Sequence, residues 1–297
     1  MAAPQLSRSS ADAPTAPFLI TLSCPDRIGI VAEVARFLVE HGCNIIESAQ
    51  YGDVETGRFF QRTGFEPTTG EALPALREAF APIATAYAMD ARFHDMHRPT
   101  PTLIMASRFG HCLNDLLFRW RTGALPIEIK AVVSNHLDFA SLVEANGLTF
   151  HHLPVAAETR REQEAALEGL ATREGVELIV LARYMQILSP ALCARHPGRI
   201  INIHHSFLPS FTGARPYHAA HRRGVKLIGA TAHYVTEDLD EGPIIEQAVE
   251  RVTHSLSVSD YVGVGRDLEA LVLARAVKWH AEHRVLLNGA KTVIFHS

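Results

Sequence analysis

An asparagine and a histidine two residues apart, Asn202 and His204, have types and spacing that could do chemistry. They interrupt a run of β-branched residues at 200–203, which is typical of a buried strand. Side chains two apart on a strand point to the same face. In open α/β sheets, ligands bind beyond the carboxyl ends of the strands. An amide and an imidazole there could hold and protonate a carbonyl oxygen, although each residue alone is also a common structural polar group at a strand end.

An acidic loop supplies a third candidate, Asp240. The loop spans residues 236–243, follows a strand expected over residues 227–235, and closes on a Gly-Pro turn. An acidic turn alone is typical of a solvated surface, but a partly buried carboxylate beside an amide and an imidazole can do acid–base chemistry. In this hypothesis Asn202 and His204 stabilise an oxyanion. Asp240 shuttles a proton between an attacking water and a leaving nitrogen.

The expected strand at residues 227–235 adds further candidates to this site. Thr231 and His233 are two apart on it, so they face the same way and are expected to hold the water or His204. Together with Val235 they are assigned to substrate binding.

Several other chemistries lack the residues that they need. The chain has no Gly-x-Ser-x-Gly elbow for a serine nucleophile, no His-Glu-x-x-His helix for zinc, and no Gly-x-Gly-x-x-Gly after the first strand of its second half for NAD. The four cysteines form no Cys-x-x-Cys pair. His218 and His221 lie on an expected helix but have no carboxylate or cysteine companion in sequence. We therefore expect no metal and no tightly bound cofactor.

Composition limits the partners and the compartment. With 47% hydrophobic and 20% charged residues and a net charge of −4, the chain gives no electrostatic case for nucleic acid or an acidic membrane. No apolar run approaches the length of a membrane span. Residues 1–16 are rich in Ala, Ser and Pro, lack the apolar core of a signal peptide, and are expected to be a disordered tail. Widely spaced cysteines without a disulfide framework favour a cytoplasmic protein.

The order of periodic segments predicts an α/β chain of two domains. Residues 17–95 give the strand–helix–hairpin–helix–strand order, βαββαβ, of the ferredoxin-like fold. The last of these strands is expected at residues 87–93, where apolar and polar residues alternate. A Pro-rich linker over residues 96–101 leads into residues 102–297.

In residues 102–297, strands and helices alternate, which predicts a Rossmann-like, mostly parallel sheet covered on both faces. The continuous apolar run at 176–182 is typical of the interior of a parallel sheet. A long helix over residues 258–283 and a hairpin around an Asn-Gly turn end the chain. The first strand-to-helix turn, residues 107–112, contains a single glycine, Gly110.

Residues 202–204, 206–211 and 239–243 resemble the signature of the folate-dependent formyl-transfer enzymes. The resemblance places the catalytic residues of that family on Asn202, His204 and Asp240. It also implies that the pterin ring of a folate is bordered by Met185, Gln186 and Leu188. On spacing alone, these three residues fit equally well as an apolar lead into a helix at Pro190.

Residues 202–209, 213–218 and 229–234 resemble one branch of the family, the formyltetrahydrofolate deformylases. This resemblance implies hydrolysis of 10-formyltetrahydrofolate to tetrahydrofolate and formate, which supplies formate and balances the one-carbon folate pool of purine biosynthesis. The alternatives are formyl transfer to an amine acceptor and a non-catalytic folate or amino-acid sensor. Transferases of the family that use a phosphorylated acceptor carry a Gly-x-Gly-x-Asn turn, whose backbone cradles the phosphate. This chain keeps only Gly110 there, which favours water as the acceptor.

Residues 25–31 and 42–45 resemble the ACT domain, a small-molecule regulatory module that usually pairs with copies of itself. The resemblance implies an effector, often an amino acid, at the loop near Asp26 and Gly29, with Asn44 as a further candidate. It also implies a homo-oligomer formed through this module. The alternative that the module only holds subunits together stays open on the sequence.

Overall fold

The computed structural model describes residues 16–68, 72–156, 158–207 and 216–296. The chain divides between His97 and Arg98 into two compact units, each described here by itself. The expected tail lies outside the described residues except for Ala16, which is buried. In the described parts of the chain, no helix is long and apolar enough to cross a membrane.

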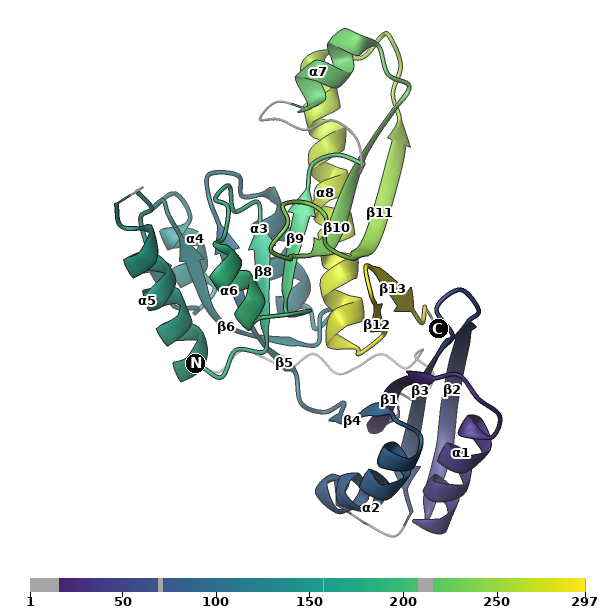
Figure 1. Cartoon of the computed structure of the whole chain (residues 1–297). Coiled ribbons are helices and arrows are strands. Elements are labelled where there is room, and N and C mark those ends of the chain that lie inside the picture. Colours follow the sequence, from purple (N-terminus) through teal and green to yellow (C-terminus); the bar gives the residue numbers. More distant parts are fainter. Residues whose placement is uncertain (1–15, 69–71, 157, 208–215, 297) are drawn as a thin grey trace. The chain divides into compact units, whose positions relative to one another are not determined.

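The first unit has the expected βαββαβ order (Figure 1). Its four-stranded antiparallel sheet has the order β2-β3-β1-β4. Its elements are β1 (Phe18–Pro25), α1 (Ile30–Glu40), β2 (Cys43–Asp53), β3 (Arg58–Pro67), α2 (Leu73–Ala86) and β4 (Asp90–Asp95). The helices pack on one core with the sheet, in which Phe80 makes edge-on contacts with Phe37 and Phe93 at centroid distances of 4.9 and 5.5 Å.

The strand expected at residues 87–93 begins later than the sequence suggested. Tyr87 is the C-cap of α2, and Ala88 takes a left-handed conformation with φ 51°. The backbone N–H of Met89 then donates to Ala84 O at 2.8 Å, so the helix ends in a Schellman-type turn. Tyr87 and Met89 pack against the core as part of this turn, which explains why their spacing resembled a strand.

The second unit is a doubly wound sheet with the order β11-β10-β9-β8-β5-β6-β7. The strands β5 to β9 are parallel, whereas β10 pairs antiparallel with β9 and β11. The strands are β5 (Thr100–Ala106), β6 (Ile127–Ser134), β7 (Phe150–His152), β8 (Leu178–Ala182), β9 (Ile200–His204), β10 (Leu227–Tyr234) and β11 (Ile244–Arg251). The expected Rossmann-like fold is confirmed. Edge strand β11 was not foreseen, because seven of its eight residues are exposed or half-buried and its burial shows little alternation.

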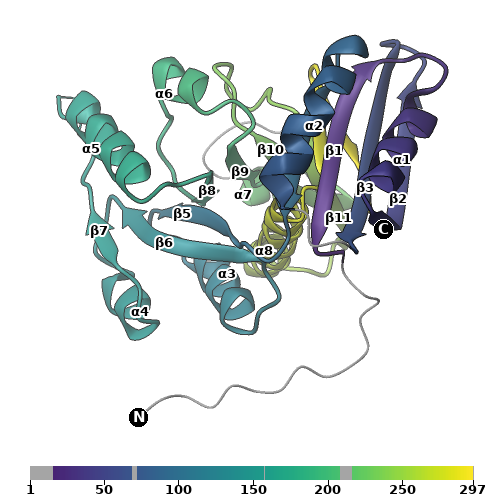
Figure 2. The same cartoon turned by 90° about the horizontal axis from the view of Figure 1, so that it is seen from below.

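Helices cover both faces of this sheet (Figure 2). One face carries α3 (His111–Arg121), α4 (Ala140–Ala145) and α8 (Val258–Ala281), and the other carries α5 (Arg160–Arg173) and α6 (Pro190–Arg195). The short helix α7 (Pro216–Arg223) packs on α8, and a hairpin of β12 (Val285–Asn288) and β13 (Lys291–Ile294) ends the unit.

Strand β5 begins at Thr100, inside the segment expected to be a linker. Both Thr100 and Pro101 pair with β6 in this strand. Pro101 lacks an N–H but is tolerated near the start of a strand, and its carbonyl accepts a hydrogen bond from Glu177 N at 2.8 Å. The proline content of residues 96–101 predicted a linker, but the last two of these residues are already part of the sheet.

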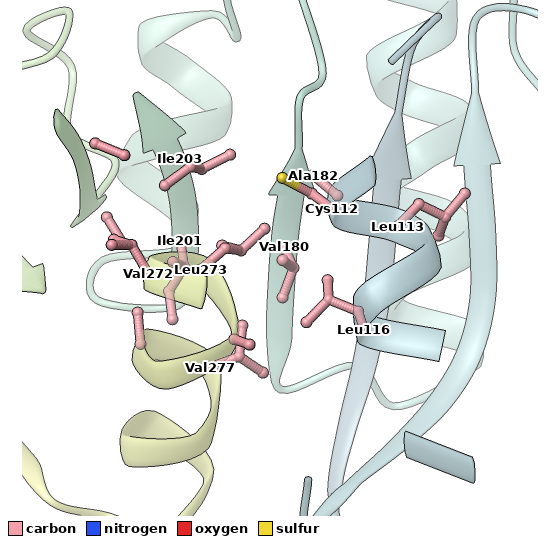
Figure 3. Packing of buried hydrophobic residues seen from close by; sticks show 14 of the residues in the cluster. Cys112, Leu113, Leu116, Val180, Ala182, Ile201, Ile203, Val272, Leu273 and Val277 are labelled. Atoms are coloured by element: carbon pink, nitrogen blue, oxygen red, sulfur yellow. The ribbon is translucent and has the colours of Figure 1, made fainter. Parts of the chain in front are cut away.

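The core between β9 and α8 determines which side chains of β9 are buried against the helix and which lie on the other face of the sheet. Ile201 and Ile203 point toward α8 and pack near Val272 and Leu273 (Figure 3). Because neighbouring side chains on a strand alternate between faces, Asn202 and His204 project from the opposite face of the sheet.

Candidate active site

The pairing of β9 with β10 brings polar side chains together at the point where the sheet changes from parallel to antiparallel. In this register His204 lies opposite Thr231, and Asn202 lies opposite His233. Asn202 Nδ2 is 3.3 Å from His233 Nε2. The two strands thus bring an amide and two imidazoles to one place.

The loop between β10 and β11 adds Asp240 to this group. Asp240 Oδ1 lies 3.2 Å from His204 Nδ1 and 3.6 Å from His233 Nε2. Asp240 takes a left-handed conformation with φ 58°, which is uncommon for a residue other than glycine. Gly242 follows in close contact with β10, where a Cβ would lie 1.7 Å from Tyr234 O. The three residues of the catalytic hypothesis therefore meet in the folded chain.

Hydrogen bonds fix the orientation of both imidazoles. His233 Nδ1 donates to Tyr234 O at 2.9 Å, so in the neutral ring Nε2 carries the lone pair and accepts from Asn202. His204 directs Nδ1 toward Asp240, and its Nε2 is buried without a hydrogen-bond partner among the described residues. A neutral His204 in this tautomer would accept at Nε2, and a protonated His204 would donate there.

Asp240 is ionised at neutral pH in this site. The hydrogen bond from His204, and after it the interaction with His233, lower the pKa of Asp240 well below its usual value, although partial burial opposes them. The sequence suggested a carboxylate tuned for proton exchange near neutrality. The two imidazoles instead stabilise the carboxylate, so Asp240 begins as a proton acceptor and an anchor for His204.

A cavity of about 390 Å³ opens beside these residues. Its walls are the segment after β8, residues 183–188, and the loop at residues 235–240, and its floor includes Asn202, His204 and His233. Four further residues expected to bind substrate also line it, namely Met185, Gln186, Leu188 and Val235. Met185, Ile187 and Leu239 are large apolar side chains left 45%, 57% and 61% exposed. The cavity can therefore hold a flat, partly apolar molecule next to the polar group.

Thr231 is placed differently from its expected role. Its side chain is fully buried and does not line the cavity in the described part of the chain. Its hydroxyl donates to Ser206 O and accepts from Gln247 Nε2, each at 3.0 Å. Thr231 thus ties β10 to the residues after β9, behind His204.

Residues 18–81 match the ACT domain family, and residues 102–277 match the family described as formyl transferase. A curated formyltetrahydrofolate deformylase of Corynebacterium sp. (strain P-1) is 51% identical over 93% of this chain and 97% of its own length, and one of Bacillus subtilis is 49% identical over 93% of each. A crystal structure of the formyltetrahydrofolate deformylase of Burkholderia mallei superposes with a TM-score of 0.91 at 52% identity, covering 95% of this chain and all of the other.

The chain belongs to the formyltetrahydrofolate deformylase family. All three resemblances seen in the sequence are confirmed. A glycinamide ribonucleotide transformylase of Symbiobacterium toebii is a more distant neighbour, with a TM-score of 0.63 at 31% identity over 67% of this chain and 95% of the other. The deformylases match both units, whereas this match covers only about two thirds of the chain.

The first strand-to-helix turn of this deformylase-family chain is filled by its own side chains. A Cβ on Gly110 would lie 2.4 Å from the ring of Phe139, so the glycine serves to admit that ring. His111, the first residue of α3, donates from Nε2 to Glu269 Oε2 at 2.7 Å. Ser107 Oγ donates to Asn135 Oδ1 at 2.7 Å. A carboxylate of the chain thus lies at the helix N-terminus, the place that attracts anions.

The candidate metal ligands of the second unit make contacts with other groups of the chain. Within the described residues, His111, Cys112 and Glu269 are the group close enough to share an ion. Tyr217 also donates to Glu269, and Arg183 lies beside it, so the carboxylate already has partners and a cation. His221, expected on a helix with His218, has Nε2 3.2 Å from Leu256 O. Glu269 and His221 therefore already have partners within the chain.

The expected effector residues of the ACT-type unit do not all lie together in one chain. Asp26 and Gly29 share the loop after β1, where Asp26 N donates to Gly57 O at 2.9 Å and Gly29 has φ 99°. Asn44 lies near the start of β2 and pairs with Glu66, at the other end of the sheet. The strand between these two ends of the sheet, β1, spans roughly 25 Å. Asn44 of the same chain therefore does not face that loop.

Sequence reasoning missed some residues of the cavity. Arg183, Tyr184 and Leu239 line it but were not singled out. The position of Arg183 and Tyr184 directly after the carboxyl end of β8 was the available signal, because ligands bind at such strand ends. The stretch 208–215, which carries part of the family resemblance, lies outside the described residues.

Proposed function

We propose that this chain hydrolyses 10-formyltetrahydrofolate to tetrahydrofolate and formate. The observation that supports this most directly is His204, whose Nε2 is buried without a partner among the described residues and whose ring lines the cavity. Asp240 holds the other nitrogen of the ring. An unpartnered buried polar atom is costly, so a ligand that reaches it gains a strong interaction.

In the proposed reaction, water adds to the formyl carbon and the C–N bond then breaks. One N–H of Asn202 is directed at His233, which leaves the second N–H to donate to the developing oxyanion. Protonated His204 donates to the same oxygen from Nε2, and Asp240 stabilises the imidazolium. Asp240 takes a proton from the attacking water, and a proton is returned to the leaving nitrogen. The products are formic acid and the free amine of the folate.

The filled strand-to-helix turn supports water as the acceptor. A phosphorylated acceptor would have to place its phosphate near the N-terminus of α3, where Glu269 and Phe139 already lie. The negative charge of Glu269 would oppose a phosphate there, because like charges repel. Water needs no docking site of this kind.

The first unit supports a regulatory role and assembly. We propose that the loop near Asp26 and Gly29 binds a small effector such as an amino acid, and that the unit joins copies of the chain into a homo-oligomer. The match to the ACT family supports both proposals. Cys24, Cys112 and Cys193 are buried as free thiols, which supports a reducing compartment, and we propose the cytosol.

The test is formate release from 10-formyltetrahydrofolate by the purified full chain with no acceptor present. We expect one formate and one tetrahydrofolate per substrate consumed. Parallel reactions with added glycinamide ribonucleotide or free amino acids should give no formylated acceptor. Formyl transfer to an acceptor, or binding of the folate without turnover, would refute the proposal.

A further inference from the structure

A buried carboxylate outside the reacting group connects four segments of the second unit. Glu269 lies on α8, and its side chain is 1% exposed. Its Oε2 accepts from His111 Nε2 at 2.7 Å and lies 3.2 Å from Arg183 Nε, and its Oε1 accepts from Tyr217 OH at 2.6 Å. These partners come from α3, from the segment after β8 and from α7. Glu269 itself does not line the cavity in the described part of the chain.

Arg183 is the partner that leads to the cavity. It follows β8 directly and takes a left-handed conformation with φ 62°, although it is not a glycine. Such a conformation persists only where the surroundings hold it in place. In the described part of the chain, the guanidinium is held by its ion pair with Glu269, in which Nε makes no hydrogen bond, and by the ring of Phe109, 5.3 Å from the guanidinium carbon.

The rest of this segment is held by other groups. Met185 N donates to Ser107 Oγ at 3.0 Å, and Tyr184 OH accepts from Gln163 Nε2 at 3.2 Å. At the far end, the backbone N–H of Ser189 donates to Glu164 Oε1 at 2.8 Å. Glu269 therefore fixes only one end of the segment, the turn at Arg183.

The electrostatic state of Glu269 suits this role. Burial alone would raise the pKa of Glu269, but the hydrogen bond from His111, the charge of Arg183 and the hydrogen bond from Tyr217 together bring it below its usual value. Glu269 is thus a fixed negative charge at neutral pH. Both of its oxygens are occupied by donors, which leaves it no role as a ligand for a substrate or a metal.

We infer that Glu269 is a positioning residue for substrate binding, because through Arg183 it fixes the turn at which β8 enters the cavity wall of residues 183–188. The inference rests on the proposed function only in taking that cavity as the folate site. When the charge of Glu269 is lost, the Arg183 turn relaxes and the start of this wall, where Arg183 itself lines the cavity, shifts out of position. The reacting group at Asn202, His204 and Asp240 stays in place, since none of its described contacts involves Glu269.

The test is Glu269→Gln in the full chain, which keeps the size of the side chain, removes its charge and replaces one acceptor oxygen with a donor NH2. The chain offers a matched control in Glu168→Gln. Glu168 also accepts from a histidine Nε2, that of His196 at 2.7 Å, and lies 3.3 Å from an arginine Nε, that of Arg195. Neither partner lines the cavity. For each variant we would measure KM and kcat for formate release, the Kd of tetrahydrofolate by fluorescence titration, and the unfolding midpoint.

We expect Glu269→Gln to raise KM and the Kd of tetrahydrofolate by up to about a hundredfold, as a misplacement of about an ångström can do, with a smaller change in kcat. Glu168→Gln should leave both constants unchanged even where it lowers the unfolding midpoint. An unchanged Kd in Glu269→Gln, or an equal rise in both variants, would overturn the inference. If Glu269→Gln fails to fold, Glu269→Asp keeps the charge but shortens the reach to Arg183. It should give a raised Kd, and a wild-type value there would refute the inference. A wild-type protein that binds tetrahydrofolate but releases no formate would refute the proposed function alone.

Discussion

The second unit contains two clusters in which a carboxylate contacts histidine side chains, and they differ in burial and in which atoms have partners. We call the cluster around Asp240 the open cluster and the cluster around Glu269 the closed cluster. Asp240 lies beside two imidazoles at the cavity, has a side chain 23% exposed, and leaves Nε2 of His204 without a partner among the described residues. Glu269 is almost fully buried and has both oxygens occupied by His111, Arg183 and Tyr217. The difference lies in which group is left without a hydrogen bond among the described residues: in the first cluster it is the imidazole at His204 Nε2, and in the second it is the countercharge at Arg183 Nε, while both oxygens of Glu269 accept hydrogen bonds.

The largest expected effect is on turnover at the open cluster. Asp240→Asn removes the base and the charge that stabilises protonated His204, so we expect kcat to fall by about 10²–10⁴. The Kd of tetrahydrofolate should change little, since the apolar walls of the cavity remain. Single-turnover formate release and a folate titration would measure the two quantities. Turnover near that of the wild type would remove Asp240 from the mechanism.

The closed cluster should show the opposite pattern, a large loss of stability. Glu269→Gln leaves the guanidinium of Arg183 buried without its countercharge, which typically costs about 3–5 kcal/mol. Asp240→Asn leaves behind imidazoles that can become neutral, so it should cost less. Urea unfolding of both variants at neutral pH would measure the two free energies of unfolding. A larger loss of unfolding free energy in Asp240→Asn than in Glu269→Gln would show that the Asp240 cluster contributes more to stability.

The two clusters also differ in how far the sequence could predict them. Asn202 and His204 were accessible because they are two apart in an apolar strand, and the face left by Ile201 and Ile203 is fixed by alternation. Glu269 had only a weak local signal, an acidic residue within the apolar stripe of α8. Its partner His111 is 158 residues away in the chain. Long-range register, such as the pairing of Asn202 with His233, depends on the whole sheet and cannot be found from local periodicity.

The same limit explains the boundaries that moved. The strand expected to begin at Tyr87 begins at Asp90, because the C-terminal turn of α2 uses Tyr87 and Met89 as core residues. Local alternation cannot separate such a turn from a strand. The order of elements, which depends on many residues at once, was predicted correctly in the first unit and, apart from edge strand β11, in the second.

The pH dependence of stability gives a smaller effect at the open cluster. The pKa of Asp240 is lowered in the folded protein. Its carboxylate therefore stabilises the fold at every pH above the pKa of Asp240 in the unfolded chain, which is about 4. The contribution is lost as the pH falls through the lower folded value. The difference in unfolding free energy between the wild type and Asp240→Asn should therefore be constant near neutrality and shrink below about pH 4. A difference that grows on acidification would mean that Asp240 is not held as a carboxylate by its two histidines.

The smallest expected effect comes from trimming one donor of the closed cluster. Tyr217→Phe removes the hydroxyl that donates to Glu269 Oε1 and leaves the ring in place against Gly265, where a Cβ would lie 2.1 Å from it. The ion pair between Glu269 and Arg183 remains, so we expect a loss of about 0.5–1.5 kcal/mol in unfolding free energy and a nearly unchanged KM. The outcome separates the two functions of the cluster, because the Tyr217 contact anchors α7 and the Arg183 contact anchors the cavity wall. A rise in KM as large as that of Glu269→Gln would show that the cluster acts as one unit and that Arg183 is not its specific link to the cavity.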